Sequence, residues 1–144
     1  MLRVMSLLAT LVLVAAALTL FFGHALVATN PIGLAIQALA IALMIWARVT
    51  FGMRSFHAAA NPTEGGLVTR GPYRFWRHPI YASILYFFWA AIVSHAAWWT
   101  ITAGVVATLA VAVRIASEEA LLVERYPEYR EYAARTKRLV PFVV

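Results

Sequence analysis

Long apolar stretches separated by short polar segments run through the whole chain. Residues 4–22 are apolar apart from three Ser and Thr residues, and residues 32–51 form a second, mostly apolar stretch after the dipeptide Asn30-Pro31. Such a dipeptide is typical of a turn followed by the first residue of a helix. A helix needs about 20 apolar residues to cross a bilayer core, so both stretches predict membrane spans. We expect the first to remain a span rather than to be cleaved as a signal peptide, because it stays apolar through Phe22.

A third apolar stretch, residues 79–113, contains 35 residues without a single Asp, Glu, Lys or Arg. One straight helix of this length would be about 52 Å long, whereas the hydrocarbon core of a bilayer is about 30 Å thick. A break at Ser94-His95 divides the stretch into two spans, at about 79–93 and 96–115. The pattern therefore predicts an all-α membrane protein with about four transmembrane helices, the last two forming a C-terminal helical hairpin.

The basic residues predict how these spans are oriented. All twelve Lys and Arg residues lie before the first span, between the last turn of the second span and the third, or from the last residues of the fourth span onward, and the two other connections contain none. The positive-inside rule places both termini, the loop at 52–78 and the basic tail at 116–144 in the cytoplasm. We therefore expect one integral membrane domain over residues 1–144, in the inner membrane if the cell is bacterial.

Composition excludes several classes of protein. Apolar residues make up 63% of the chain and charged residues 12%, whereas an ordinary soluble domain carries about 25% charge. The net charge of +6 would suggest nucleic acid as the partner of a soluble protein, but this chain has too little polar surface for that role. The absence of Cys excludes disulfides and thiolate metal sites, and scattered His residues do not predict a metal centre.

The segment that leads into the third span carries the first candidate site. Pro79 suits the first turn of a helix, where its missing N–H is not needed. His78 then lies at the helix N-terminus, where backbone N–H groups can hold an anionic group, and Tyr81 follows about one turn later. The same residues also fit a simpler role, in which aromatic and cationic side chains hold a helix end at the membrane surface.

Arg114, Glu118 and Glu119 form the second candidate site at the end of the fourth span. Arg114 and Glu118 are four residues apart and share a helical face. Glu119 is turned about 100° away, so if Glu118 belongs to a functional site, Glu119 is expected to contribute little to it. Adjacent carboxylates at a membrane edge are costly unless they are paired, hydrated or functional. The residues alone therefore leave open an interfacial ion pair and a functional site.

Taken together, the order and spacing of these segments resemble a known family. The matching segments are Gly66-Leu67-Val68-Thr69-Arg70-Gly71-Pro72-Tyr73, Arg77-His78-Pro79-Ile80-Tyr81, Glu118-Glu119, and the closing stretch from Tyr126 to Pro141. This ordered set, over about residues 50 to 142, is similar to the isoprenylcysteine carboxyl methyltransferases and phospholipid N-methyltransferases of membranes.

The resemblance implies an enzyme that transfers a methyl group from S-adenosylmethionine to a lipophilic acceptor: an isoprenoid-linked carboxylate, a lipid amine or a similar group. It implies a catalytic role for Arg114, near the acceptor, and for Glu118. It also implies a cofactor site lined by Gly65, Gly66, Leu67, Val68, Tyr73, His78, Pro79, Ile80, Tyr81 and Glu118. The chain departs from the family pattern at Gly65, Ser83 and Pro127, and the acceptor and oligomeric state do not follow from the resemblance.

Two other interpretations remain open at this point. Membrane steroid reductases have a broadly similar C-terminal half and use a nicotinamide cofactor, although they tend to be longer. A small membrane scaffold without enzymatic activity would need the two clusters only as interfacial side chains and ion pairs. Binding of S-adenosylmethionine, of the nicotinamide cofactor, or of neither separates the three interpretations.

Overall fold

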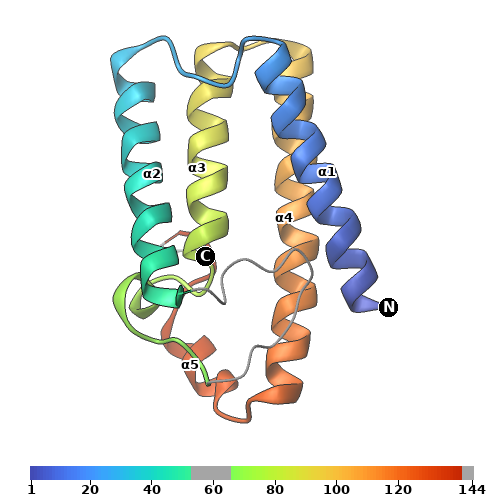
Figure 1. Ribbon diagram of the computed structural model, residues 1–144, viewed down its shortest axis with the longest axis vertical. Coiled ribbons are helices and arrows are strands. Elements are labelled where there is room, and N and C mark those ends of the chain that lie inside the picture. Colours follow the sequence, from blue (N-terminus) through green and yellow to red (C-terminus); the bar gives the residue numbers. More distant parts are fainter. Residues whose placement is uncertain (53–65, 141–144) are drawn as a thin grey trace.

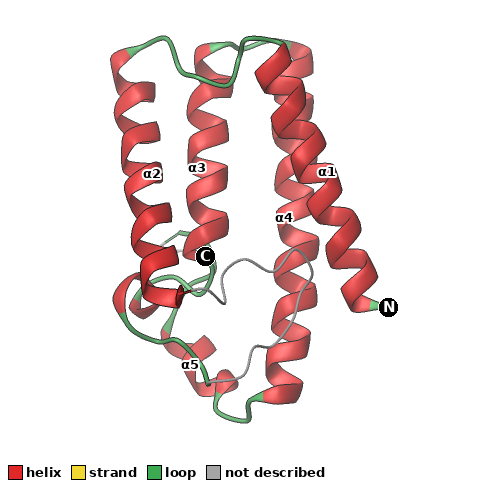
Figure 2. Cartoon of the chain, viewed as in Figure 1, coloured by secondary structure: helices red, strands yellow, loops and turns green. Residues whose placement is uncertain are grey.

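Helices make up almost all of the regular structure in the computed structural model, which describes residues 1–52 and 66–140 (Figure 1). No strand occurs in these two segments (Figure 2), and the all-α prediction is confirmed. The helices are α1 (Leu2–Phe22), α2 (Pro31–Phe51), α3 (Pro79–Ser94), α4 (Trp98–Arg125) and the short α5 (Tyr129–Arg135), with a 3-10 turn, η2, at Gly71–Arg74.

Three helices, α1, α2 and α4, are long and apolar enough to cross a membrane. Helix α3 is also apolar but has only 16 residues, about 24 Å at 1.5 Å per residue. Helix α4 has 28 residues, about 42 Å, and continues ten residues past the span end expected at 115. Four apolar helices, two of them forming the α3–α4 hairpin, agree with the architecture expected from the sequence.

Helix α1 is packed out of chain order, next to α4 instead of α2. Helix α1 packs against α4, α2 packs against α3, and α3 contacts α4, so that α2, α3, α4 and α1 lie side by side in Figure 1. The main apolar core lies between α1, α3 and α4, where Leu20, Ile92 and Ala107 are fully or almost fully buried. The connection from α1 to α2 therefore crosses one end of the bundle.

A buried glutamine makes three hydrogen bonds at this crossing connection. Gln37 of α2 accepts a hydrogen bond from the Ala28 backbone N–H at 2.9 Å and donates to the Leu26 carbonyl at 2.9 Å and the Phe87 carbonyl at 3.2 Å. The side chain thereby joins the α1–α2 connection to both α2 and α3. Because apolar surroundings offer no replacement partners, these bonds matter more here than they would on a wet surface.

Replacing Gln37 by leucine is expected to lower the unfolding temperature in detergent micelles by about 5 °C. The variant keeps the side-chain volume but removes three hydrogen bonds, and an unsatisfied buried polar group costs about 1–3 kcal/mol. Leu39→Ala, on the same helix at a position that is 71% exposed, provides the control and should change the temperature little. Equal unfolding temperatures for the two variants would contradict this role of Gln37.

The two ends of the bundle differ in character. The N-terminus of α1, the C-terminal half of α4 and helix α5 lie at one end, and the short α1–α2 and α3–α4 connections lie at the other (Figure 1).

Large apolar side chains remain exposed around the outside of the bundle, among them Leu39, Val49 and Trp98, which are 71%, 76% and 81% exposed. Such an outer surface suits contact with lipid rather than with water.

Candidate functional site

The segment that leads into α3 is held between α2 and the C-terminal part of the chain. Gly71 has a positive φ of 59°, and a Cβ at this position would lie 2.7 Å from the Thr50 hydroxyl of α2. Only glycine therefore permits both the backbone conformation and the close approach. Two residues later, the ring of Tyr73 packs 5.5 Å from that of Phe51, which completes the contact between η2 and the end of α2.

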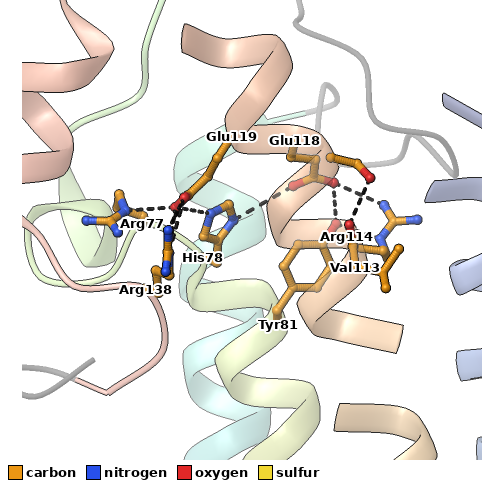
Figure 3. Close-up of polar contacts among 9 residues, drawn as sticks. Arg77, His78, Tyr81, Val113, Arg114, Glu118, Glu119 and Arg138 are labelled. Atoms are coloured by element: carbon orange, nitrogen blue, oxygen red, sulfur yellow. Dashed lines mark hydrogen bonds and ion pairs between the residues drawn. The ribbon is translucent and has the colours of Figure 1, made fainter. Parts of the chain in front are cut away.

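Residues 75–78 pair through their backbone with residues 137 and 138. The N–H of Arg77 donates to the Lys137 carbonyl at 2.6 Å, the N–H of His78 donates to the Arg138 carbonyl at 3.2 Å, and the N–H of Lys137 donates to the Phe75 carbonyl at 3.2 Å. This short parallel bridge brings the C-terminal segment beside the first turn of α3. It places the side chain of Arg138 next to those of Arg77 and His78 (Figure 3).

Glu119 of α4 is bound by three basic side chains from these two segments. Its Oε1 lies 3.0 Å from Arg77 Nε and 3.2 Å from His78 Nε2, and its Oε2 lies 2.8 Å from Arg138 Nη2 (Figure 3). The carboxylate side chain is only 14% exposed, and the pKa of Arg138 is raised by its hydrogen bonds to this group. Glu119 therefore has partners that its helical face did not predict, because they come from segments that return to α4. Its small contribution to a functional site stays a prediction.

The second carboxylate, Glu118, faces a different set of partners. Its Oε1 accepts hydrogen bonds from the Tyr81 hydroxyl and, at 3.2 Å, from Arg114 Nη2, while its Oε2 lies 3.7 Å from His78 Nδ1. The side chain is 23% exposed, more than that of Glu119. The hydrogen bonds to Oε1 fix the Glu118 side chain, and Oε2 can still accept further hydrogen bonds.

His78 lies between the two carboxylates. One ring nitrogen faces Glu119 and the other faces Glu118, and the imidazole, with its side chain only 6% exposed, stacks on the ring of Tyr81 at a centroid distance of 5.7 Å. A protonated imidazole donates at both nitrogens, whereas a neutral one donates at only one of them. His78 also occupies the N-cap position of α3, but its side chain makes no capping hydrogen bond. Its ring contacts the two carboxylates instead.

Arg114 is buried, 5% exposed, behind Glu118 and Tyr81. Its Nε donates to the Tyr81 hydroxyl at 2.7 Å and its guanidinium lies 5.3 Å from the centre of the Tyr81 ring. The ion pair with Glu118 at four-residue spacing is present as expected. Arg77, His78, Tyr81, Arg114, Glu118, Glu119 and Arg138 are called the carboxylate cluster below.

Other residues expected in the site lie nearby or precede the cluster. Tyr73 is buried, and its pKa is raised by burial and further by the charges of Tyr132 and Glu118. Pro79 and Ile80 form the first turn of α3, and Gly66, Leu67 and Val68 precede η2 in irregular backbone. Gly65 lies outside the described residues, so the cofactor contact expected there stays a prediction.

The sequence placed Arg77 and Arg138 in the matching segments but gave neither of them a role in the site. Arg77 also donates from Nη1 to the carbonyls of Ala133 and Thr136, both at 2.5 Å, and so holds the end of α5 as well. Burial raises the pKa of Tyr132 to about 12, and this phenol donates to the Tyr73 carbonyl at 2.8 Å. The sequence did contain a signal for these contacts: the C-terminal tail has an excess of basic residues, and α4 carries two adjacent carboxylates. Interpreting each helix by itself does not pair the tail with these carboxylates.

One of the comparisons with known proteins found a match. The family model for phospholipid methyltransferases matches residues 50–129, more than half of the chain, and the matched region contains α3, α4 and most of the carboxylate cluster. No curated protein and no solved structure matches the chain. With its long apolar helices and this match, the chain belongs to the phospholipid methyltransferase family of membrane proteins.

Proposed function

We propose that this protein is an S-adenosylmethionine-dependent methyltransferase that acts on a lipophilic acceptor and that the whole chain, residues 1–144, works as one domain. The family match supports methyl transfer. The observation that carries the proposal is Glu118, which is fixed at Oε1 by Tyr81 and Arg114 and keeps acceptor capacity at Oε2. It is placed next to the N-terminus of α3, where an anionic group can bind.

The residues present fit the polar part of S-adenosylmethionine. Glu118 can accept hydrogen bonds from ribose hydroxyls or from the amino group. The N–H groups of Ile80 and Tyr81 in the first turn of α3 can bind the carboxylate, because such N–H groups have no partner within the helix. His78 would line the same place, with its ring held by Glu118 and Glu119. Tyr73 and the segment from Gly65 to Val68 would line the same site, as would Pro79, Ile80 and Tyr81.

The chemistry requires little of the protein beyond positioning. S-adenosylmethionine would supply an electrophilic methyl group on a sulfonium, which a carboxylate or an unprotonated amine can attack without a dedicated base. The methyl–sulfur bond would break as the new bond forms, S-adenosylhomocysteine would leave, and a methylated amine would release its proton to water. The cluster then orients the reactants and provides electrostatic stabilisation. The lipid-covered outer surface would let an isoprenoid-linked carboxylate or a lipid amine approach from the bilayer, while the cofactor enters from the aqueous side.

The expected test result is transfer of a mass-labelled methyl group from S-adenosylmethionine into a species of a membrane lipid extract, measured by mass spectrometry with purified protein. A reaction without protein is the control. Binding of a nicotinamide cofactor without binding of S-adenosylmethionine would contradict the proposal and favour a reductase. Binding of neither cofactor would contradict it in favour of a scaffold.

The proposed orientation places both termini and the carboxylate cluster in the cytoplasm. It is supported by the basic residues, which all lie outside the α1–α2 and α3–α4 connections. It also suits a soluble cofactor that is made in the cytosol. In a bacterium the protein would occupy the inner membrane.

A cysteine introduced as His95→Cys is expected to react with an impermeant thiol reagent only from outside the cell. His95 follows α3 at the end of the bundle opposite the carboxylate cluster. The chain has no native Cys, so no background labelling arises from it. Arg125→Cys, at the end of α4, is the matched variant and should react only after the membrane is made permeable. The reverse pattern would overturn the orientation.

A further inference from the structure

Helix α1 contributes directly to the carboxylate cluster, although it lies outside the family match at residues 50–129. Arg114 Nη1 donates to the Ser6 carbonyl at 3.2 Å and to the Thr10 hydroxyl. The Thr10 hydroxyl in turn donates to the same Ser6 carbonyl at 2.9 Å. Ser6 is fully buried, so this contact lies in the interface between α1 and α4 rather than at the surface.

The contacts of Arg114 divide into two sides. On one side, Nε holds the Tyr81 hydroxyl and Nη2 holds Glu118. On the other side, Nη1 is held by α1. A guanidinium is a rigid planar group with five N–H donors, so fixing one nitrogen fixes the direction of the others. In apolar surroundings these donors have no water to replace a lost partner.

The sequence of α1 agrees with a dedicated contact. Among its 21 residues the polar uncharged side chains are Ser6, Thr10 and Thr19. Ser6 and Thr10 are four residues apart and therefore lie on one face, the face that meets Arg114. Thr19 is exposed, and its hydroxyl bonds only within α1, to the Ala15 carbonyl.

We propose that Thr10, together with the Ser6 carbonyl, positions Arg114 and through it Tyr81 and Glu118, so that α1 completes the cofactor site. The inference rests on the proposed function, because it assigns Glu118 to the binding of S-adenosylmethionine. Thr10 is a positioning residue, since it acts through Arg114 and not on the cofactor itself.

The test measures the dissociation constant of S-adenosylmethionine in micelles, well below the unfolding temperature. Thr10→Val keeps the shape but removes the hydroxyl, and is expected to raise the dissociation constant about fivefold, the effect of one hydrogen bond. Thr10→Ser restores the hydroxyl and should bind like the wild type. Thr19→Val, the same substitution on the same helix, is the control and should also bind like the wild type.

A second test compares the effect of Thr10→Val on cofactor affinity in two backgrounds. A purely structural role of Thr10 would give the same effect in both. In a Glu118→Gln background, Thr10→Val should weaken cofactor binding by less than twofold, because both changes act through one carboxylate. Fully additive effects would overturn the proposal. If the valine variant does not fold, Thr10→Ala is measured in its place with the same serine rescue.

The failures of the two proposals are distinguishable. If the wild type does not bind S-adenosylmethionine, the proposed function fails and this inference fails with it. If the wild type binds and Thr10→Val matches Thr19→Val, only the role of α1 is overturned. Equal weakening by Thr10→Val and Thr10→Ser would also overturn it, because the serine retains the hydroxyl that the argument requires.

Discussion

Glu118→Gln is expected to weaken the binding of S-adenosylmethionine by at least about tenfold. The amide cannot hold the Tyr81 hydroxyl and the Arg114 guanidinium as a carboxylate does, and it presents a neutral group where the proposed site needs a charged acceptor. Hydrogen bonds to charged groups contribute about 1.5–3 kcal/mol, which corresponds to a change of ten- to a hundredfold in affinity. Calorimetric titration in micelles measures the affinity of each variant for S-adenosylmethionine.

A matched control lies six residues further along α4, at Glu124. Glu124→Gln removes the same charge from an exposed position on the same helix and should leave the affinity within twofold of the wild type. If Glu118→Gln and Glu124→Gln bind the cofactor equally well, Glu118 serves only as an interfacial ion-pair partner. The proposed function would then rest on the family match alone.

Glu119→Gln is expected to affect stability more than binding. It removes the charge that faces Arg77, His78 and Arg138, three groups from two different segments. Breaking a buried ion pair costs about 3–5 kcal/mol, and partial exposure of Arg138 reduces this to about 2–4 kcal/mol. The unfolding temperature should fall by about 5–10 °C, and limited proteolysis should release the segment around α5 at lower protease concentration.

The control for this prediction is Glu131→Gln. Glu131 forms an ion pair with Arg135, but the two side chains are 68% and 72% exposed, and an exposed pair contributes about 0–1 kcal/mol. This variant should unfold within about 2 °C of the wild type. Equal unfolding temperatures for Glu119→Gln and Glu131→Gln would show that the Glu119 contacts do not hold the C-terminal segment.

Hydropathy was sufficient to predict the helices but not their neighbours. The apolar stretches predicted the start of each long helix to within two residues and the ends of α1, α2 and α3 to within one, because length and charge decide whether a segment can cross a bilayer. Helix α4 runs ten residues past the end expected at 115. They could not indicate that α1 packs against α4 and α2 against α3, since lipid-facing and helix-facing positions are both apolar. The polar residues Ser6 and Gln37 were the available hints, because each is buried against another helix.

The candidate site was predicted only in part, because the sequence indicates contacts within one helix but not contacts between distant segments. Spacing within one helix was enough to pair Arg114 with Glu118, and proline placement was enough to put His78 at the start of α3. The partners of Glu119 come from segments on both sides of the α3–α4 hairpin, and no local spacing rule connects residue 77 with residue 138. Contacts made by chain segments distant in sequence require the fold itself.

The pairing of residues 75–78 with 137–138 has a consequence for the order of assembly. These segments are separated by the whole α3–α4 hairpin, so they can meet only after both helices have inserted and turned back on themselves. Closing so long a loop is slow relative to forming the helices within it. The hairpin therefore forms before the carboxylate cluster, and newly inserted chains pass through a stage in which all the long helices are present but the carboxylate cluster is not.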